Sequence, residues 1–172
     1  MIRRRSLPLP LQSLKGRPMG YGHCVDGRVV GVYRDFLVIA QPDEHSSEVL
    51  TYEWIDMASA RWDQPSGKLS ISFVDSSVLA LVLELQRGQS EDIAPLIHER
   101  VDSSFFWRQR QKLPSGTDAV FMIRSGKKSR LSIQVLYDTA PSEADKDFIE
   151  SMYERMRDLA NISEESAQEA EV

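Results

Sequence analysis

The chain has 172 residues, enough for one ordinary domain or two small ones, and 41% of them are hydrophobic and 27% charged, as in folded globular proteins. This composition excludes collagen, coiled coils and wholesale disorder, and no apolar run approaches the roughly 18 residues that span a bilayer, so we expect no integral membrane protein. The net charge of −5 is unevenly spread, because residues 99–130 carry eight cationic and three acidic side chains whereas residues 131–172 carry three and eleven.

Residues 1–18 form the first predicted segment. They carry five cationic side chains and no acidic one, and prolines interrupt their apolar stretch Leu7–Leu11. A stretch this short and broken is not the apolar region of a secretory signal peptide. We expect a mobile basic arm. Because Cys24 is the single cysteine, the chain cannot form an internal disulfide, which favours a cytoplasmic location.

Short antiparallel strands are predicted over the next part of the chain. Residues 28–41 predict a hairpin that turns at Arg34–Asp35, and residues 49–62 form a second stretch rich in β-branched and aromatic side chains. Alternation of apolar and polar residues predicts strands at Leu69–Phe73 and Val78–Leu85. These strands together predict a meander.

The periodicity changes near Ser90, where a helix is predicted. Asp92 is a suitable N-cap and Pro95 lies in the first turn, while Ile93 and Ile97 recur at the four-residue spacing of a helix face. We therefore expect residues 19–104 to form a β-rich domain that ends with a closing helix.

Residues 105–162 predict a β-hairpin followed by a C-terminal helix. Residues 105–113, 119–124 and 131–137 have strand composition. Ser142 and Asp145 have the spacing of a capping box at a helix start. The predicted core-facing stripe of this helix consists of Phe148, Ile149, Met152, Tyr153, Met156 and Leu159. Residues 163–172 are acidic and nearly free of bulky apolar side chains, so we expect a disordered tail.

Three stretches carry a family resemblance. Gly31–Ile39, with the sequence Gly-Val-Tyr-Arg-Asp-Phe-Leu-Val-Ile, Thr51–Asp63, which begins Thr-Tyr-Glu-Trp-Ile-Asp, and Glu99–Val101 resemble a group of uncharacterised actinobacterial proteins with a pleckstrin-homology-like domain. The resemblance implies an α+β fold, in which a pleckstrin-homology-like antiparallel sheet is closed by a helix and followed by a β-β-α extension. It implies no catalytic residue.

The residue types that support catalysis or metal binding form no motif. His23 and Cys24 are neighbours on a predicted strand, so their side chains point to opposite faces. His45 and His98 lie far from them in sequence. We expect no enzymatic activity, no metal and no cofactor, with a hydrolase as the minor alternative.

Cationic and aromatic side chains alternate between residues 100 and 130. Two strands that present such cations on one face would bind phosphate groups, although a solvated basic surface is the simpler interpretation. The candidate ligand-binding residues are Arg108, Arg110, Lys112, Arg124, Lys127, Lys128 and Arg130. Because the whole chain is acidic, our first hypothesis is a non-catalytic module that binds an unknown protein partner through an apolar or aromatic strand edge. The alternative is a binder of anionic phosphate, on lipid or RNA, through residues 108–130.

Overall fold

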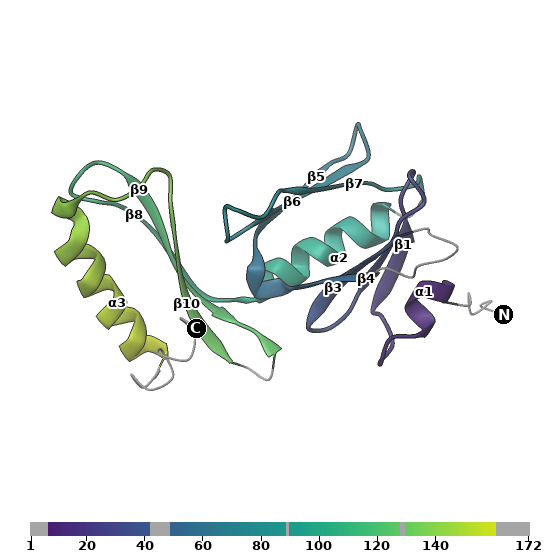
Figure 1. Cartoon of the computed structure of the whole chain (residues 1–172), viewed down its shortest axis with the longest axis horizontal. Helices are drawn as coiled ribbons and strands as arrows, with labels where there is room; N and C mark the ends of the chain where they lie inside the picture. The colour runs from purple at the N-terminus through teal and green to yellow at the C-terminus, as the bar shows by residue number, and fades with distance from the viewer. Residues whose placement is uncertain (1–6, 42–48, 89, 128–129, 161–172) are drawn as a thin grey trace. The chain divides into compact units, whose positions relative to one another are not determined.

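The computed structural model describes residues 7–41, 49–88, 90–127 and 130–160. This described part is a mixed α+β protein with three antiparallel sheets (Figure 1). The chain divides into two compact units, residues 1–103 and residues 104–172. The predicted tail 163–172 lies outside the described residues.

The first sheet belongs to the first unit and has four antiparallel strands in the order β1-β2-β3-β4. They are β1 (Gly20–His23), β2 (Val29–Val32), β3 (Phe36–Ala40) and β4 (Val49–Glu53). Residues 28–41 form the predicted hairpin, since β2 pairs with β3 and the Tyr33 N–H donates to the Phe36 carbonyl at 3.0 Å across the turn. Val29–Val32 are all buried, so this strand is covered on both of its faces.

The second sheet of the first unit has the order β5-β6-β7. Its strands are β5 (Met57–Asp63), β6 (Lys68–Phe73) and β7 (Leu81–Glu84). The predicted strand at Leu69–Phe73 is confirmed, and the stretch 49–62 contains parts of two strands, β4 and β5, which a 3₁₀ turn, η1 (Trp54–Asp56), divides. The buried Trp54 indole fixes this turn, since its Nε1 donates to the Tyr33 carbonyl at 3.2 Å and the Arg34 carbonyl at 3.1 Å.

The strand predicted at Val78–Leu85 begins later than expected. The Val78 N–H donates to the Asp75 carbonyl at 3.1 Å, and the Ser77 N–H donates to the Asp75 carboxylate at 2.8 Å, so the chain is still turning at these residues. Leu79 is consequently 89% exposed instead of facing a core, and β7 starts only at Leu81.

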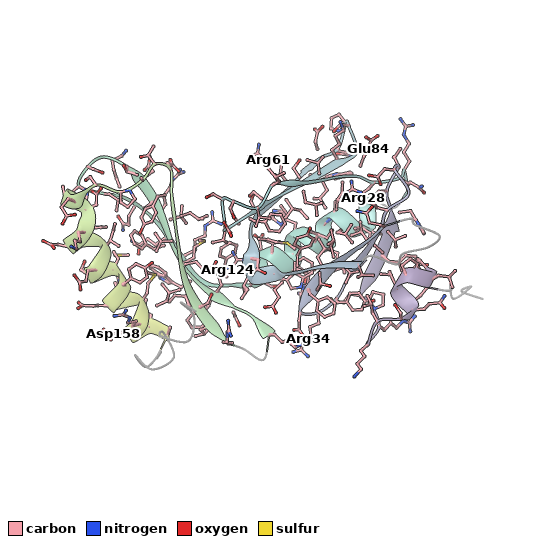
Figure 2. The ribbon with its side chains drawn as sticks, viewed as in Figure 1. Arg28, Arg34, Arg61, Glu84, Arg124 and Asp158 are labelled. Carbon is pink, nitrogen blue, oxygen red and sulfur yellow. The ribbon has the colours of Figure 1, made fainter. Side chains whose placement is uncertain are left out.

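The two sheets of the first unit are joined where β1 and β7 end. Cys24 and Leu85 form an antiparallel bridge, and the Gln86 N–H donates to the His23 carbonyl at 2.9 Å. Arg28 lies at this junction (Figure 2), where its guanidinium donates to the Val82 carbonyl at 2.9 Å and to the Asp26 carboxylate at 2.7 Å. Arg28 therefore ties the β1–β2 turn to β7.

Helix α2 (Ser90–Ser103) lies between the two sheets of the first unit (Figure 1). Its apolar residues Ile93, Ile97 and Val101 are buried, as the four-residue spacing predicts. The helix begins at Ser90, so Asp92, the predicted N-cap, lies inside the helix instead of preceding it.

The described part of the predicted N-terminal arm, residues 7–18, packs on the first sheet instead of extending from it. It contains the single helical turn α1 (Leu9–Gln12), and Leu11 is fully buried against a cluster that includes Val29, Val38 and Ala40. The apolar side chain of Leu11 drives this packing, because its burial removes hydrocarbon surface from water.

The second unit consists of a three-stranded antiparallel sheet with a helix on one face (Figure 1). The sheet has the order β10-β9-β8, from β8 (Phe105–Lys112), β9 (Asp118–Ser125) and β10 (Leu131–Tyr137). The 3₁₀ turn η3 (Glu143–Asp145) leads into α3 (Lys146–Ala160), and the predicted capping box of Ser142 and Asp145 is present. Met152 and Met156 are buried, but Leu159, which the sequence places in the core stripe, is 47% exposed.

No helix in the part of the chain that the structure describes is both long and apolar enough to cross a membrane.

Candidate binding surface on strand β8

Strand β8 forms an edge of the second-unit sheet, so only β9 pairs with it within that sheet. The side chains of Trp107, Gln109 and Gln111 are half-buried, and Trp107 packs into the core beneath α3. Arg108, Arg110 and Lys112 alternate with them and are exposed on the opposite face. An edge strand presents a row of unpaired backbone N–H and C=O groups, to which another extended chain can add.

A β-bulge at the start of β8 changes which side chains share a face. Phe105 pairs with Arg124 and Trp107 pairs with Ile123, which leaves Phe106 as the extra residue. Simple alternation puts Phe105 and Trp107 on one face, but the bulge places Phe105 on the face of the cations instead. Phe106 is left 59% exposed at the beginning of the strand.

Phe105 forms the centre of a small aromatic and cationic cluster. The Arg124 guanidinium carbon lies 4.0 Å from the centroid of the Phe105 ring, and that of Arg108 lies 5.1 Å from it. Both distances are within the range in which the negative face of an aromatic ring attracts a cation. The cluster orients Arg108 at the exposed surface.

Arg124, a predicted ligand-binding residue, is fully buried. Its Nη2 and Nε donate to the Ser104 hydroxyl at 2.6 Å and 3.0 Å. A guanidinium that is enclosed and hydrogen-bonded in this way supports the position of β8 beside β9. It presents no accessible surface to a ligand.

Two of the exposed cations have carboxylate partners. Arg110 lies 3.9 Å from Asp138, and Lys112 lies 3.5 Å from Asp118 while it also donates to the Gly116 carbonyl at 3.1 Å. Exposed pairs of this kind contribute little to stability, so either cation can exchange its partner for another anion. Within the described residues, Arg108 has no carboxylate within 4.0 Å.

The remaining predicted residues belong to the β9–β10 loop. Lys127 and Arg130 are exposed, and the Arg130 N–H donates to the Lys127 carbonyl at 3.3 Å. Lys128 lies outside the described residues. This loop adjoins the Phe105 end of the sheet, whereas Lys112 lies at the other end of β8, about 23 Å away at the rise of an extended strand. The predicted cations therefore form a row and a separate loop cluster instead of one compact site.

Sequence reasoning missed two features of this surface. The contact of Arg124 with Ser104 joins the end of β9 to the residue before β8, 20 residues away in sequence, and no local pattern predicts it. The sequence did not predict the bulge at Phe106 either, although two aromatic residues at the start of the strand are compatible with a bulge.

The described residues contain no group of three or more His, Cys, Asp and Glu side chains arranged to hold a metal ion. Cys24 is buried, and burial, reinforced by nearby Asp26, raises the pKa of its thiol to about 11 in spite of the opposing charge of Arg28. His98 and Asp102 form an exposed pair at 3.0 Å, one turn apart on α2.

Comparison with protein-family models, curated proteins and solved structures gave no match. The resemblance to pleckstrin-homology-like proteins accordingly stays a prediction.

Proposed function

We propose that this chain is a non-catalytic module that binds an extended segment of another protein along β8. The observation that carries the proposal is the combination of a strand edge that pairs with no other described strand, the exposed Phe106 and a cationic row on one face. Added strands gain affinity from backbone hydrogen bonds and specificity from alternate side chains.

The cationic row gives the chemistry of the segment. Arg108, Arg110 and Lys112 recur at every second residue and so lie along one face of the strand. A neighbouring strand with carboxylates at alternate positions would place each of them beside a cation, and opposite charges across a strand pair are stabilising. We infer an acidic, extended partner segment with an apolar residue opposite Phe106.

A defined peptide tests this proposal. An acetylated peptide of alternating Glu and Val, titrated against the full chain, is expected to bind weakly. The double variant Arg108→Glu/Arg110→Glu should weaken this binding at least tenfold, because it replaces attraction by repulsion. The matched control is Lys146→Glu/Arg155→Glu, two exposed cations on α3, which should leave the affinity unchanged.

A second peptide separates strand addition from simple charge attraction. Replacing two Val residues by Pro keeps all the carboxylates but removes backbone donors and disfavours pairing. We expect the proline peptide not to bind. Equal binding of both peptides would contradict the proposal, because charge alone would then account for the interaction.

The alternative function is recognition of anionic phosphate at the loop end of the sheet. The favouring observation is that Arg108, Lys127 and Arg130 are exposed near that end and none has a described carboxylate partner. Phosphate binding would weaken steeply between low and moderate salt. It would also be abolished when Arg108, Arg110, Lys127 and Lys128 are together changed to Glu, and inorganic phosphate would compete for the site.

We also propose that the first unit has a pleckstrin-homology-like fold. The support is its element order, in which four antiparallel strands and then three are followed by α2. This order is compatible with the sheet closed by a helix that the resemblance implies. The fold by itself assigns no ligand, since one fold supports many functions.

We propose a cytoplasmic location. The chain has one cysteine, and that cysteine is buried with a raised pKa, so it is poorly suited to form a disulfide with another chain.

A further inference from the structure

The face of the first sheet that points away from α2 is apolar over β2 and β3, and its polar side chains, His23, Thr51 and Glu53, come from the flanking strands β1 and β4. Gly20 marks the opposite, α2-facing side, because a Cβ added there would lie 3.0 Å from Leu96 and 3.2 Å from Ile93. Side chains alternate along a strand, so Tyr21 and its neighbours across the sheet point the other way. We call this side the outer face. It contains Tyr21, Val29, Tyr33, Phe36, Val38 and Ala40.

Residues 7–14 occupy part of the outer face. Leu11 lies directly above Gly31, where an added Cβ would come within 3.0 Å and 3.1 Å of the two Leu11 methyl groups. Leu14 follows three residues later and is half-buried in the same cluster. The absence of a side chain at Gly31 therefore leaves the space that Leu11 fills, and we call this space on the outer face the apolar seat.

The segment is attached to this face by side-chain packing alone within the described residues. Its hydrogen bonds are internal, from the Leu11 N–H to the Pro8 carbonyl at 2.9 Å and from the Gln12 side chain to the Leu7 carbonyl at 2.6 Å. The first hydrogen bond to the sheet comes later, from the Met19 N–H to the Val32 carbonyl at 2.7 Å. A segment with so few backbone contacts opens at lower free energy than the sheet unfolds.

The joint between the segment and the sheet permits such an opening. Gly16 has a φ of +95°, a conformation that other residues rarely adopt, and it lies between exposed Lys15 and exposed Arg17. Rotation there would lift residues 7–14 without disturbing β1.

The outer face also contains an unsatisfied polar group. Tyr33 is buried and stacks on Phe36 at 4.8 Å between ring centroids, but its hydroxyl has no hydrogen-bond partner within the described residues. A buried hydroxyl without a partner is costly. The segment fills the apolar seat without supplying a partner to this hydroxyl.

From these contacts we propose that the outer face is a docking site for a leucine-bearing peptide of a partner protein, and that residues 7–14 occupy the site in cis until that peptide displaces them. The bound segment defines the chemistry of the ligand. The ligand is a short segment with one helical turn and two leucines three residues apart, the second just beyond the turn, as at Leu11 and Leu14, and it carries a polar group within reach of the Tyr33 hydroxyl. This docking site is separate from the proposed surface on β8.

The test uses the full chain and a labelled peptide with the sequence of residues 6–15. In the variant Leu11→Asp, a carboxylate would be forced into the apolar seat, so the chain's own segment should leave it. This variant should bind the peptide at least tenfold more tightly than the wild type, in which a tethered competitor acts at an effective concentration of about 1 mM. A peptide with the same leucine changed to Asp should not bind.

The matched control is Leu11→Asp/Gly31→Ala. The added methyl group lies where the leucine methyls would sit, so peptide affinity should fall about fivefold while the segment stays displaced. Equal affinity of the wild type and Leu11→Asp, or no binding to a Leu11→Asp chain that retains the wild-type circular dichroism spectrum, would overturn the proposal.

Hydrogen exchange on the wild type provides a test that needs no variant. The Leu11 and Leu14 amides should exchange at least 100-fold faster than the paired amides of β3, because the segment opens without the sheet. Exchange at the rate of β3 would overturn the proposal. A dimer that forms with rising concentration and is abolished by Leu11→Asp would also overturn it, because a second copy would then be the occupant.

Discussion

At the scale of single residues, the Asp145 carboxylate joins three parts of the second unit. It accepts hydrogen bonds from the Ser115 N–H at 2.8 Å and from the Ser142 N–H and hydroxyl at 2.8 Å and 2.9 Å. Burial alone would raise the pKa of Asp145, but these hydrogen bonds outweigh burial and hold the pKa at about 2, below the ordinary 3.8. The capping box was predictable from the spacing of Ser142 and Asp145. The bond from Ser115 was not, because it comes from a turn distant in sequence.

Asp145 should make the stability of the chain sensitive to acid. Its folded pKa is depressed, so its contribution is present above the unfolded pKa of about 4 and is lost as the pH falls through about 2. We expect Asp145→Asn to lower the melting temperature at pH 7, with a smaller difference from wild type at pH 2. Calorimetry at several pH values checks this, and a difference that does not shrink in acid would contradict it.

Cys24 should be unreactive in the folded chain. Because burial raises the pKa of its thiol to about 11, very little thiolate is present at pH 8 and the sulfur is enclosed. A chromogenic disulfide reagent should therefore label the native chain very slowly and label one thiol per chain at once in denaturant. Fast labelling of the native chain would show that the β1 end opens readily.

At the scale of the elements, helix α3 shows where periodicity succeeds and where it stops. The stripe that includes Met152 and Met156 packs on Phe121 and Ile123 of β9, as a 3.6-residue repeat predicts. Leu159 lies at the margin of this stripe, whose buried line runs through Met152, Met156 and Ala160. The residue is therefore on the predicted face and yet exposed.

Two substitutions on α3 should separate these positions. Met156→Ala leaves a cavity in a filled core and should cost about 2–4 kcal/mol of unfolding free energy. Leu159→Ala should cost less than about 1 kcal/mol, because water already reaches that side chain. Denaturant unfolding of the two variants measures both values, and equal losses would contradict the packing described here.

The sequence predicted where the strands lie better than it predicted where a turn or a bulge interrupts them. Alternation located Leu69–Phe73, and turn composition located the hairpin at Arg34–Asp35. The interruptions were missed because each depends on a contact distant in sequence or on one extra residue. Trp54 turns the chain by bonding to carbonyl groups about 20 residues away, and the bulge at Phe106 moves Phe105 to the other face.

The sequence predicted which cationic residues lie near the candidate site, but it did not predict which of them are exposed on one face. The sequence identifies Arg108, Arg110 and Lys112 as alternating cations, and they do share an exposed face. It cannot distinguish them from Arg124, which has the same side chain but is enclosed by Phe105 and Ser104. Only the pairing of β8 with β9 makes this distinction.

At the scale of the whole molecule, the first compact unit has two sheets with α1 and α2, the second has one sheet with α3, and each has one proposed binding surface. The surface on β8 is cationic although the chain has a net charge of −5, and the outer face of the first sheet is apolar over β2 and β3. The two proposed surfaces differ in their chemistry. They would not compete for the same ligand.

Strand addition at β8 is tested most directly by an amide hydrogen-exchange footprint of the full chain with and without the Glu-Val peptide. Strand addition predicts slower exchange for amides within Phe105–Lys112, which lie on a free edge, and unchanged exchange in β10 and α3. Peptide binding that leaves exchange of the β8 amides unchanged, or that slows exchange in β10 instead, would contradict strand addition at β8.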